Sequence, residues 1–231
     1  MKNRILESFK AAFPKTLPVF LGYLFLGTAF GVSLTSRGYH FGWAILMSLT
    51  IYAGSGQFLG VNILTSGFNL ISAAFMTLMV NLRHIFYGLS MFDKFDGMGK
   101  KKPYMIFSLT DETYSLLFST KPPKNVDEKW FYFFIAMLNQ SYWILGSTIG
   151  AVAGYLIKFD STGIDFAMTA LFVVIFVEQW EGSKNHLPSI LGLGISLICL
   201  VVFGMEYFIA FSMLGILISL LAVKKGVEKN A

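Results

Sequence analysis

The chain has 231 residues, of which 55% are hydrophobic and 13% are charged. Soluble domains carry about 25% charged residues, so this composition excludes a soluble enzyme. The formal net charge is +5. The basic residues lie at the chain ends and between apolar runs, which suits lipid head groups and cytoplasmic loops rather than nucleic acid. The single cysteine, Cys199, provides neither a disulfide nor a thiolate metal site.

Uncharged runs recur along the chain and are long enough to cross a bilayer, which takes about 20 helical residues. We therefore predict an all-α, polytopic membrane helix bundle. The segment Met1–Lys15 is basic and mildly amphipathic and lacks a signal-peptide cleavage site, so we expect it to lie along the cytoplasmic interface. The apolar segments that follow it fall at about 16–36, 43–66, 69–92, 105–119, 129–157, 164–180, 187–204 and 206–223.

Two of these segments are interrupted. Segment 43–66 contains Ala53–Gln57 (AGSGQ), and segment 164–180 runs into Glu178–Gly182 (EQWEG). Glycine weakens a helix by about 1 kcal/mol per residue. The basic clusters near the N-terminus, at residues 94–102 and at residues 224–229 can all be cytoplasmic only if an even number of crossings separates each pair. Six full spans plus two broken or re-entrant helices satisfy this rule, with a cytoplasmic N-terminus; seven or eight full crossings are the alternative.

A weak internal repeat divides the predicted transmembrane domain, residues 1–231, into pseudo-repeats at 16–119 and 129–223. Leu26–Gly31 (LGTAFG) is similar to Leu145–Gly150 (LGSTIG), and Gln57–Gly60 (QFLG) lies in a position similar to that of Gln179–Gly182 (QWEG). In the predicted topology, spans 16–36 and 129–157 run in opposite directions. This predicts an inverted repeat, as in secondary transporters, with a substrate site where both halves have broken helices.

The broken helices provide the first candidate site residues, Gly54, Ser55, Gly56 and Gln57, whose unwound backbone would present N–H and C=O groups to an ionic or zwitterionic ligand. Close helix packing is the alternative explanation for the small residues. In the second broken helix, Glu178 and Gln179 are candidates of the same kind, whereas Glu181 is expected to face solvent.

Ionisable residues near or within apolar segments provide the second group of candidates. Asn81, Arg83 and His84 lie before the end of segment 69–92, where an unpaired arginine would be costly in hydrocarbon. Snorkelling of Arg83 and a packing role for His84 are the alternatives. Asp111 and Glu112 interrupt segment 105–119. Adjacent carboxylates disfavour each other's ionisation, so one could exchange a proton during transport, with Arg83 as a natural partner. An interfacial helix with both acids in water is the alternative.

Other patterns predict packing or exclude functions. Glycines recur every fourth residue at Gly27 and Gly31, and again at Gly146, Gly150 and Gly154, which is typical of close helix contacts. We find no P-loop, no cluster of metal ligands and no nucleophile with its base. We therefore predict that the protein is not an enzyme and has no cofactor and no metal site.

The chain resembles the AzlC family, the large subunit of two-component branched-chain amino acid exporters. The resemblance is carried by Tyr52–Phe58 (YAGSGQF), Asn81–His84 (NLRH) with Tyr87-Gly88, Thr110–Thr113 (TDET) and Gly163–Ala167 (GIDFA). It implies export of leucine, isoleucine, valine and analogues such as azaleucine from the bacterial cytoplasm through the inner membrane. It also implies a small hydrophobic partner subunit, AzlD.

These observations lead to the hypothesis of an exporter that works by alternating access and is driven by the proton motive force. In this hypothesis the broken helices and Asn81 bind the amino acid, and Arg83, His84, Asp111 and Glu112 couple the proton to it. An exporter or channel for another small solute and a structural membrane subunit without transport activity are the alternatives.

Overall fold

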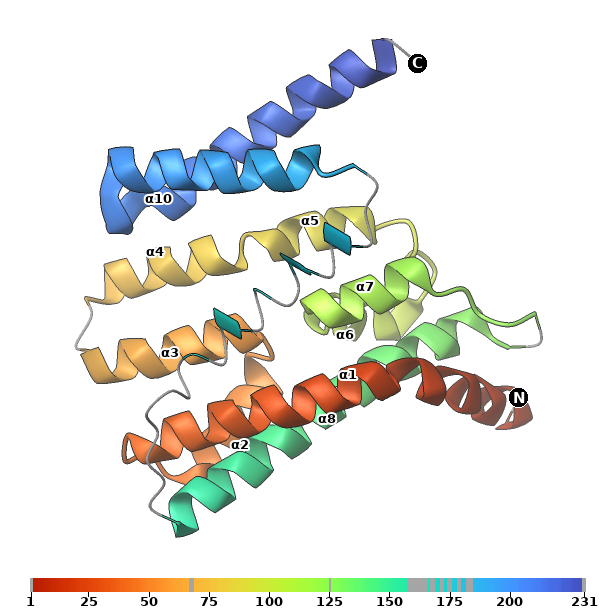
Figure 1. The fold of residues 1–231 in the computed structure, drawn as a ribbon. Helices are drawn as coiled ribbons and strands as arrows, with labels where there is room; N and C mark the ends of the chain where they lie inside the picture. Colours follow the sequence, from red (N-terminus) through yellow and green to blue (C-terminus); the bar gives the residue numbers. More distant parts are fainter. Residues whose placement is uncertain are drawn as a thin grey trace. The chain divides into compact units, whose positions relative to one another are not determined.

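A computed structural model describes residues 2–66, 69–124, 126–157, 166, 169–170, 173, 176–177, 180–181 and 185–229. Every regular element in this part of the chain is a helix, as predicted (Figure 1). The chain divides into two compact units, Met1–Met168 and Thr169–Ala231. The predicted single domain with two pseudo-repeats stays a prediction.

Two of the described helices, Arg4–Ser36 and Leu187–Met205, are long and apolar enough to cross a membrane. Several helices of the first unit also expose large apolar side chains; Phe25 is 69% exposed, Leu70 86% and Ile71 78%. Contiguous apolar faces are rare on soluble monomers and typical of surfaces that contact lipid or a partner. The exposed apolar surface therefore agrees with the predicted membrane environment.

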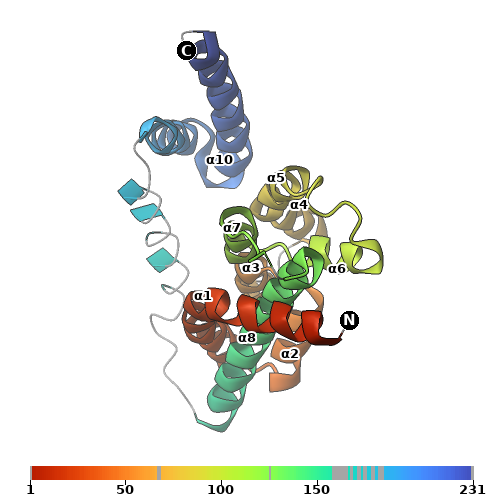
Figure 2. The ribbon, with the colours of Figure 1, turned by 90° about the vertical axis from the view of Figure 1, so that its right-hand side faces the viewer.

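Helices α1 (Lys2–Ser36) and α8 (Glu128–Leu156) pack against each other and run in the same direction (Figure 1 and Figure 2). Near their N-terminal ends, Ser8 Oγ lies 3.3 Å from the carbonyl oxygen of Asp127. Further along, the hydroxyls of Thr16 and Tyr142 are 3.0 Å apart. The prediction that spans 16–36 and 129–157 run in opposite directions is therefore wrong, and this pair gives no support to the predicted inverted repeat.

Glycines allow the backbones of α1 and α8 to touch, as the recurring glycines predicted. A Cβ atom at Gly27 would lie 2.8 Å from the amide nitrogen of Ser147, and one at Gly146 would lie 2.5 Å from the carbonyl oxygen of Tyr23. A Cβ at Gly150 would overlap the backbone of Thr28. Because such contacts are with backbone rather than flexible side chains, larger residues would force the helices apart.

Segment 41–66 forms a helical hairpin, α2 (Phe41–Thr50) followed by α3 (Gly54–Ser66). The chain turns at Tyr52, whose φ angle of 43° is unfavourable for a bulky residue. The hydroxyl of Tyr39, before α2, donates to the carbonyl oxygen of Leu64, near the end of α3, at 3.2 Å. Segment 43–66 is therefore interrupted and folds back on itself, as predicted for a re-entrant helix rather than a full crossing.

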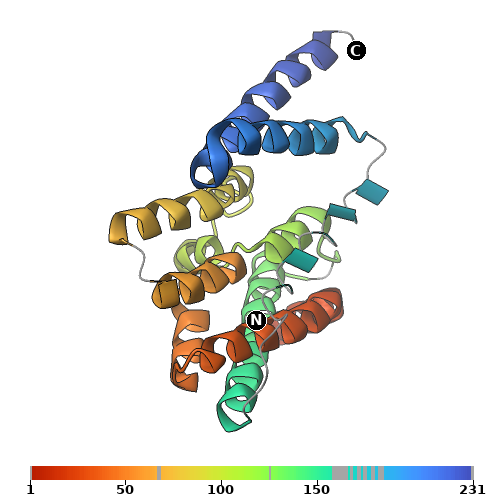
Figure 3. The same cartoon turned by 60° about the vertical axis from the view of Figure 1, so that its left-hand side comes forward.

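The chain then returns along α4 (Leu70–Asn81) and α5 (Arg83–Ser90); α4 lies beside α3 (Figure 3). The basic loop after α5 reaches the end of the unit where α1 and α8 begin. Lys129 Nζ donates to the carbonyl oxygen of Gly97 at 2.6 Å, and Lys101 Nζ lies 3.4 Å from the centre of the Trp130 ring. The first two basic clusters therefore lie at the same end of this unit, as the topology prediction requires.

Segment 105–119 is a second hairpin rather than the predicted full span. The short 3-10 helix η1 (Gly99–Lys101) leads into α6 (Lys102–Phe107), and α7 (Asp111–Ser119) follows after three residues. Lys94 Nζ donates to the carbonyl oxygen of Leu117, so α7 ends beside the basic loop from which α6 starts. The physical cause is Thr110, whose side chain accepts from the Thr113 N–H at 3.3 Å and starts a new helix.

In the second unit, α10 (Leu187–Lys229) is interrupted at Gly204, whose φ angle is 69°. This interruption is the boundary predicted between segments 187–204 and 206–223. The predicted broken segment 164–180, including Glu178 and Gln179, lies largely outside the described residues.

Candidate functional site

The two hairpins enter the first unit from opposite ends and meet near the middle of α8. On the α2–α3 hairpin, Gln57 Oε1 accepts a hydrogen bond from Trp143 Nε1 at 2.8 Å. On the α6–α7 hairpin, Thr113 Oγ1 accepts one from Asn139 Nδ2 at 3.1 Å. Trp143 and Asn139 lie one turn apart near the centre of the 29-residue α8. The N-terminal ends of α3 and α7, each with a partial positive charge, therefore approach each other halfway along this helix.

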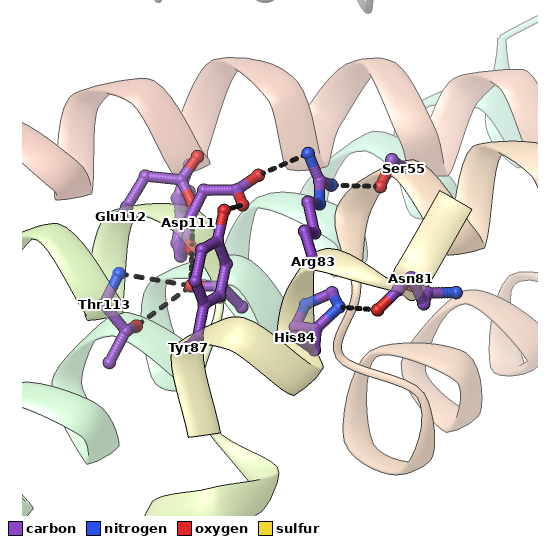
Figure 4. Close-up of polar contacts among 10 residues, drawn as sticks. Ser55, Asn81, Arg83, His84, Tyr87, Asp111, Glu112 and Thr113 are labelled. Carbon is purple, nitrogen blue, oxygen red and sulfur yellow. Dashed lines mark hydrogen bonds and ion pairs between the residues drawn. The ribbon is translucent and has the colours of Figure 1, made fainter. Parts of the chain in front are cut away.

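An ion pair joins these helix ends, as the sequence predicted (Figure 4). Arg83 Nη1 lies 3.0 Å from Asp111 Oδ2, and the side chains of the two residues are 26% and 25% exposed. Arg83 Nη2 also donates to Ser55 Oγ at 2.5 Å, and the Tyr87 hydroxyl donates to Asp111 Oδ1 at 2.6 Å. The pair thus connects α3, α5 and α7, so a movement of either hairpin must strain or break it.

Glu112 points into a different environment from its neighbour Asp111. The Tyr23 hydroxyl, on α1, donates to Glu112 Oε2 at 2.7 Å and lies 2.6 Å from Thr110 Oγ1. Within the described part of the chain, Glu112 forms no ion pair. Tyr23 and Thr110 are 3% and 6% exposed. The two acids, which the sequence suggested would act as a pair, therefore have different partners in the structure.

The predicted glycine-rich site is helical rather than unwound. Gly54, Ser55 and Gly56 form the first turn of α3, and the non-helical residues are those at 51–53. A Cβ at Gly54 would lie 3.2 Å from the Trp143 ring, and one at Gly56 would lie 3.1 Å from Asn81 Nδ2. Close packing therefore explains both glycines. The helix start also fits a ligand role, because the first N–H groups of a helix have no intrahelical acceptor.

Gln57 is fully buried, and its amide group is used within the scaffold. It accepts from Trp143 and donates to Ser48 Oγ, on α2, at 3.3 Å. A direct contact between Gln57 and a substrate would require one of these hydrogen bonds to break. The arrangement supports a positioning role, in which Gln57 holds the start of α3 against α2 and α8.

Asn81 and His84 lie at the junction of α4 and α5, beside the ion pair (Figure 4). His84 Nδ1 is 3.0 Å from the carbonyl oxygen of Asn81. Asn81 Nδ2 donates to the carbonyl oxygen of Thr77 at 2.9 Å, whereas the buried Asn81 Oδ1 has no hydrogen-bond partner within the described ranges. The structure thus brings together all the predicted site residues of the first unit. Glu178 and Gln179 lie outside the described residues.

Several residues of this site were not predicted from the sequence: Tyr23, Tyr52, Tyr87, Thr113 and Asn139. Asn139 was detectable, because an amide within an apolar span requires a partner. The tyrosines could not be identified as site residues from the sequence, because tyrosine is also common at membrane interfaces. Tyr52 is notable because it is 2% exposed and has a positive φ angle.

Comparison with known proteins assigns these helices to a family. A family model described as AzlC protein matches residues 18–157, which include all the site residues of the first unit. The chain is 47% identical over 228 residues to the branched-chain amino acid transport protein AzlC of Bacillus subtilis (strain 168), covering 99% of this chain and 90% of that protein.

More distant relatives carry less specific names. An uncharacterized membrane protein of Helicobacter pylori (strain J99) is 42% identical, with 96% of this chain and 98% of the relative covered. The inner membrane protein YgaZ of Escherichia coli (strain K12) is 26% identical, with 74% and 72% covered. No solved structure matches the chain. The family match and the identity to the Bacillus protein show that the chain belongs to the AzlC family.

Proposed function

We propose that the protein is a membrane transporter that exports branched-chain amino acids. The observation that carries the proposal is the meeting of two helical hairpins, with opposed helix starts, an ion pair and a second carboxylate, near the middle of α8. Half-helices that end near the bilayer midplane are the usual binding elements of secondary transporters. The name of the Bacillus relative supports amino acids with branched side chains as the substrate class.

The site offers complementary groups to a zwitterionic amino acid. The first-turn N–H groups of Gly54, Ser55 and Gly56 can bind the substrate carboxylate, because this helix end carries partial positive charge. Asp111 and Glu112 can bind the ammonium group. A branched aliphatic side chain transferred from water to the apolar interior would contribute about 1.5–3 kcal/mol of binding free energy.

The proposed transport also has a direction and a driving force. We infer export from a bacterial cytoplasm across the inner membrane, with the N-terminus cytoplasmic and the proton motive force as the driving force. Arg83, His84, Asp111 and Glu112 would couple proton and substrate, because a change in the charge of one of them changes the ion-pair network that joins the hairpins. Asn81, Glu178 and Gln179 remain proposed substrate contacts. A small hydrophobic AzlD-like subunit is the proposed partner.

Counterflow of labelled leucine into proteoliposomes tests the proposal, with the chain reconstituted alone and with the hydrophobic subunit encoded beside it. Leucine, isoleucine and valine inside the vesicles should each drive uptake, and a polar amino acid such as serine should not. Exchange of an unrelated solute without leucine exchange would favour the alternative of a different transporter. If Asp111→Asn combined with Glu112→Gln left leucine exchange unchanged, a structural role for these acids would be favoured.

A further inference from the structure

The two adjacent carboxylates of the site differ in how their negative charge is compensated. Asp111 has the guanidinium of Arg83 at 3.0 Å and the hydroxyl of Tyr87 at 2.6 Å. Glu112 has one side-chain partner in the described part of the chain, the neutral hydroxyl of Tyr23 at 2.7 Å. A carboxylate without a cation is costly in a low-dielectric environment and is relieved by binding a proton. Glu112 is therefore better suited than Asp111 to gain and lose a proton.

The Tyr23 hydroxyl links Glu112 to buried hydroxyl groups. Tyr23 has one hydroxyl hydrogen, yet its oxygen lies within hydrogen-bond distance of both Glu112 Oε2 and Thr110 Oγ1, at 2.7 and 2.6 Å. Tyr23 can donate to only one of them at a time. When Glu112 is ionised it can only accept, so Tyr23 must donate to Glu112 and accept from Thr110. When Glu112 is protonated it can donate to Tyr23, which then donates to Thr110.

The chain of hydroxyls continues to the centre of α8. Thr110 Oγ1 lies 3.0 Å from Thr113 Oγ1, within hydrogen-bond distance, and Thr113 Oγ1 accepts from Asn139 Nδ2 at 3.1 Å. Donation from Thr110 to Thr113 is the direction that protonated Glu112 requires. Thr113 and Asn139 are fully buried, and Asn139 Oδ1 has no hydrogen-bond partner among the residues that the structure describes. Since bulk water does not reach these groups, their orientation responds to Glu112 rather than to solvent.

We propose that Glu112 is the proton carrier of the site and that the hydroxyl chain from Tyr23 through Thr110 to Thr113 reverses its donor direction when Glu112 is protonated. A proton from water binds one carboxylate oxygen, and the Tyr23, Thr110 and Thr113 hydroxyls rotate without breaking an O–H bond. Asp111 stays ionised and keeps Arg83 in place. The inference rests on the proposed function, because it divides the roles of coupling residues within the same site.

The reversal has a structural consequence because the chain joins three parts of the unit. Tyr23 belongs to α1, Thr110 and Thr113 to the α6–α7 hairpin, and Asn139 to α8. The protonation state of Glu112 is therefore communicated to the contact between this hairpin and the α1–α8 scaffold. Other ionisable groups also face Glu112 and contribute to its electrostatic environment: Tyr23 on α1, Tyr52 between α2 and α3, Arg83 and Tyr87 on α5, and Asp111 beside it.

Infrared difference spectroscopy of the full chain in lipid vesicles tests the assignment without any transport measurement. A protonated carboxyl group has a C=O stretching band that disappears on ionisation. We expect a band that titrates with pH in the native protein, is absent in Glu112→Gln and remains in Asp111→Asn. Tyr23→Phe should keep the band but shift its frequency, because the carboxyl group loses its hydroxyl partner. Glu112→Asp, which restores a carboxyl group, should restore a titrating band.

Loss of the band in Asp111→Asn, or its persistence in Glu112→Gln, would overturn the assignment. An unshifted band in Tyr23→Phe would overturn the hydroxyl chain. If the bands behave as expected but the vesicles do not exchange leucine, the substrate proposal fails and the proton assignment stands. If leucine exchange is present and no carboxyl band depends on Glu112, the proton assignment fails alone.

Discussion

Replacing Asp111 by Asn leaves the size of the side chain almost unchanged but removes the charge that faces Arg83. The guanidinium then keeps its hydrogen bond to Ser55 but loses the counter-ion observed at 3.0 Å. Two unit charges at this distance attract by about 5 kcal/mol at an effective dielectric constant of about 20. Part of this attraction is offset by the cost of removing both charges from water.

The net effect can be bracketed from the exposure of the pair. Removing one partner of a fully buried ion pair costs about 3–5 kcal/mol, whereas an exposed pair is worth about 0–1 kcal/mol. About a quarter of each side chain of the Arg83–Asp111 pair is exposed. We therefore expect Asp111→Asn to lower the free energy of unfolding by about 2–3 kcal/mol, between these limits.

A double-mutant cycle measures this energy. Unfolding of the purified protein in detergent should be followed for Asp111→Asn, Arg83→Gln and the double variant, and the double variant should be more stable than the sum of the single losses predicts. Asp96→Asn is a matched control, because Asp96 is 83% exposed and 3.7 Å from Lys102, and it should cost less than about 1 kcal/mol. Additive losses in the double variant would refute the idea that the pair joins the hairpins.

Helix packing, a buried hydrogen bond and the membrane topology can each be tested with a single substitution. Gly150→Ala should destabilise the protein by about 1–3 kcal/mol or more, because its methyl group would overlap the backbone of α1. Gly22→Ala should not, because a carbon added there meets no other described part of the chain within 4 Å beyond its own helix backbone. Trp143→Phe should cost about 1–3 kcal/mol in unfolding free energy by leaving the buried Gln57 Oε1 without its indole donor. A cysteine at Lys100 in a cysteine-free background should react with an impermeant maleimide only from the cytoplasmic face; labelling from outside would contradict the topology.

The sequence predicted the interrupted helix at 43–66 and a pair between Arg83 and the adjacent acids Asp111 and Glu112 for sound physical reasons. Glycines and polar residues inside an apolar run disfavour a continuous helix, and an arginine near hydrocarbon needs an anionic partner. Neither argument indicates which of two adjacent acids is the partner. That choice depends on the direction in which α7 starts, and this is set by the Thr110 cap.

The direction of α8 was mispredicted because of one error in segment 105–119. Counting this segment as a crossing reverses the predicted direction of every later helix across the membrane. Spans 16–36 and 129–157 were therefore predicted to run in opposite directions. Two features of the sequence argue against a full crossing at 105–119. Fifteen residues fall short of the about 20 that a crossing helix needs, and Thr110 followed by Asp111 and Glu112 is typical of a helix start. The buried tyrosines could not be predicted, because hydropathy does not distinguish a tyrosine in a polar network from one at the interface.

The second hairpin also changes what is expected of the residues after α8. With α1 and α8 parallel and a cytoplasmic N-terminus, both helices cross outward. If the basic cluster at residues 224–229 is cytoplasmic, an odd number of crossings must follow α8. The predicted segments there are 164–180, 187–204 and 206–223. Because 187–204 and 206–223 are both predicted to be full spans, an odd total requires segment 164–180 to cross as well. Six full spans and two broken elements are then kept, with 105–119 rather than 164–180 as the second broken element.

This revised topology is testable with single cysteines in a cysteine-free background. A cysteine at Lys225 should be labelled only from the cytoplasmic face, as should one at Lys100, whereas one at Arg37, between α1 and α2, should be labelled from outside. External labelling at Lys225 together with cytoplasmic labelling at Lys100 would mean that an even number of crossings follows α8. Segment 164–180 would then be re-entrant after all, and Glu178 and Gln179 would lie in a third hairpin rather than in a complete span.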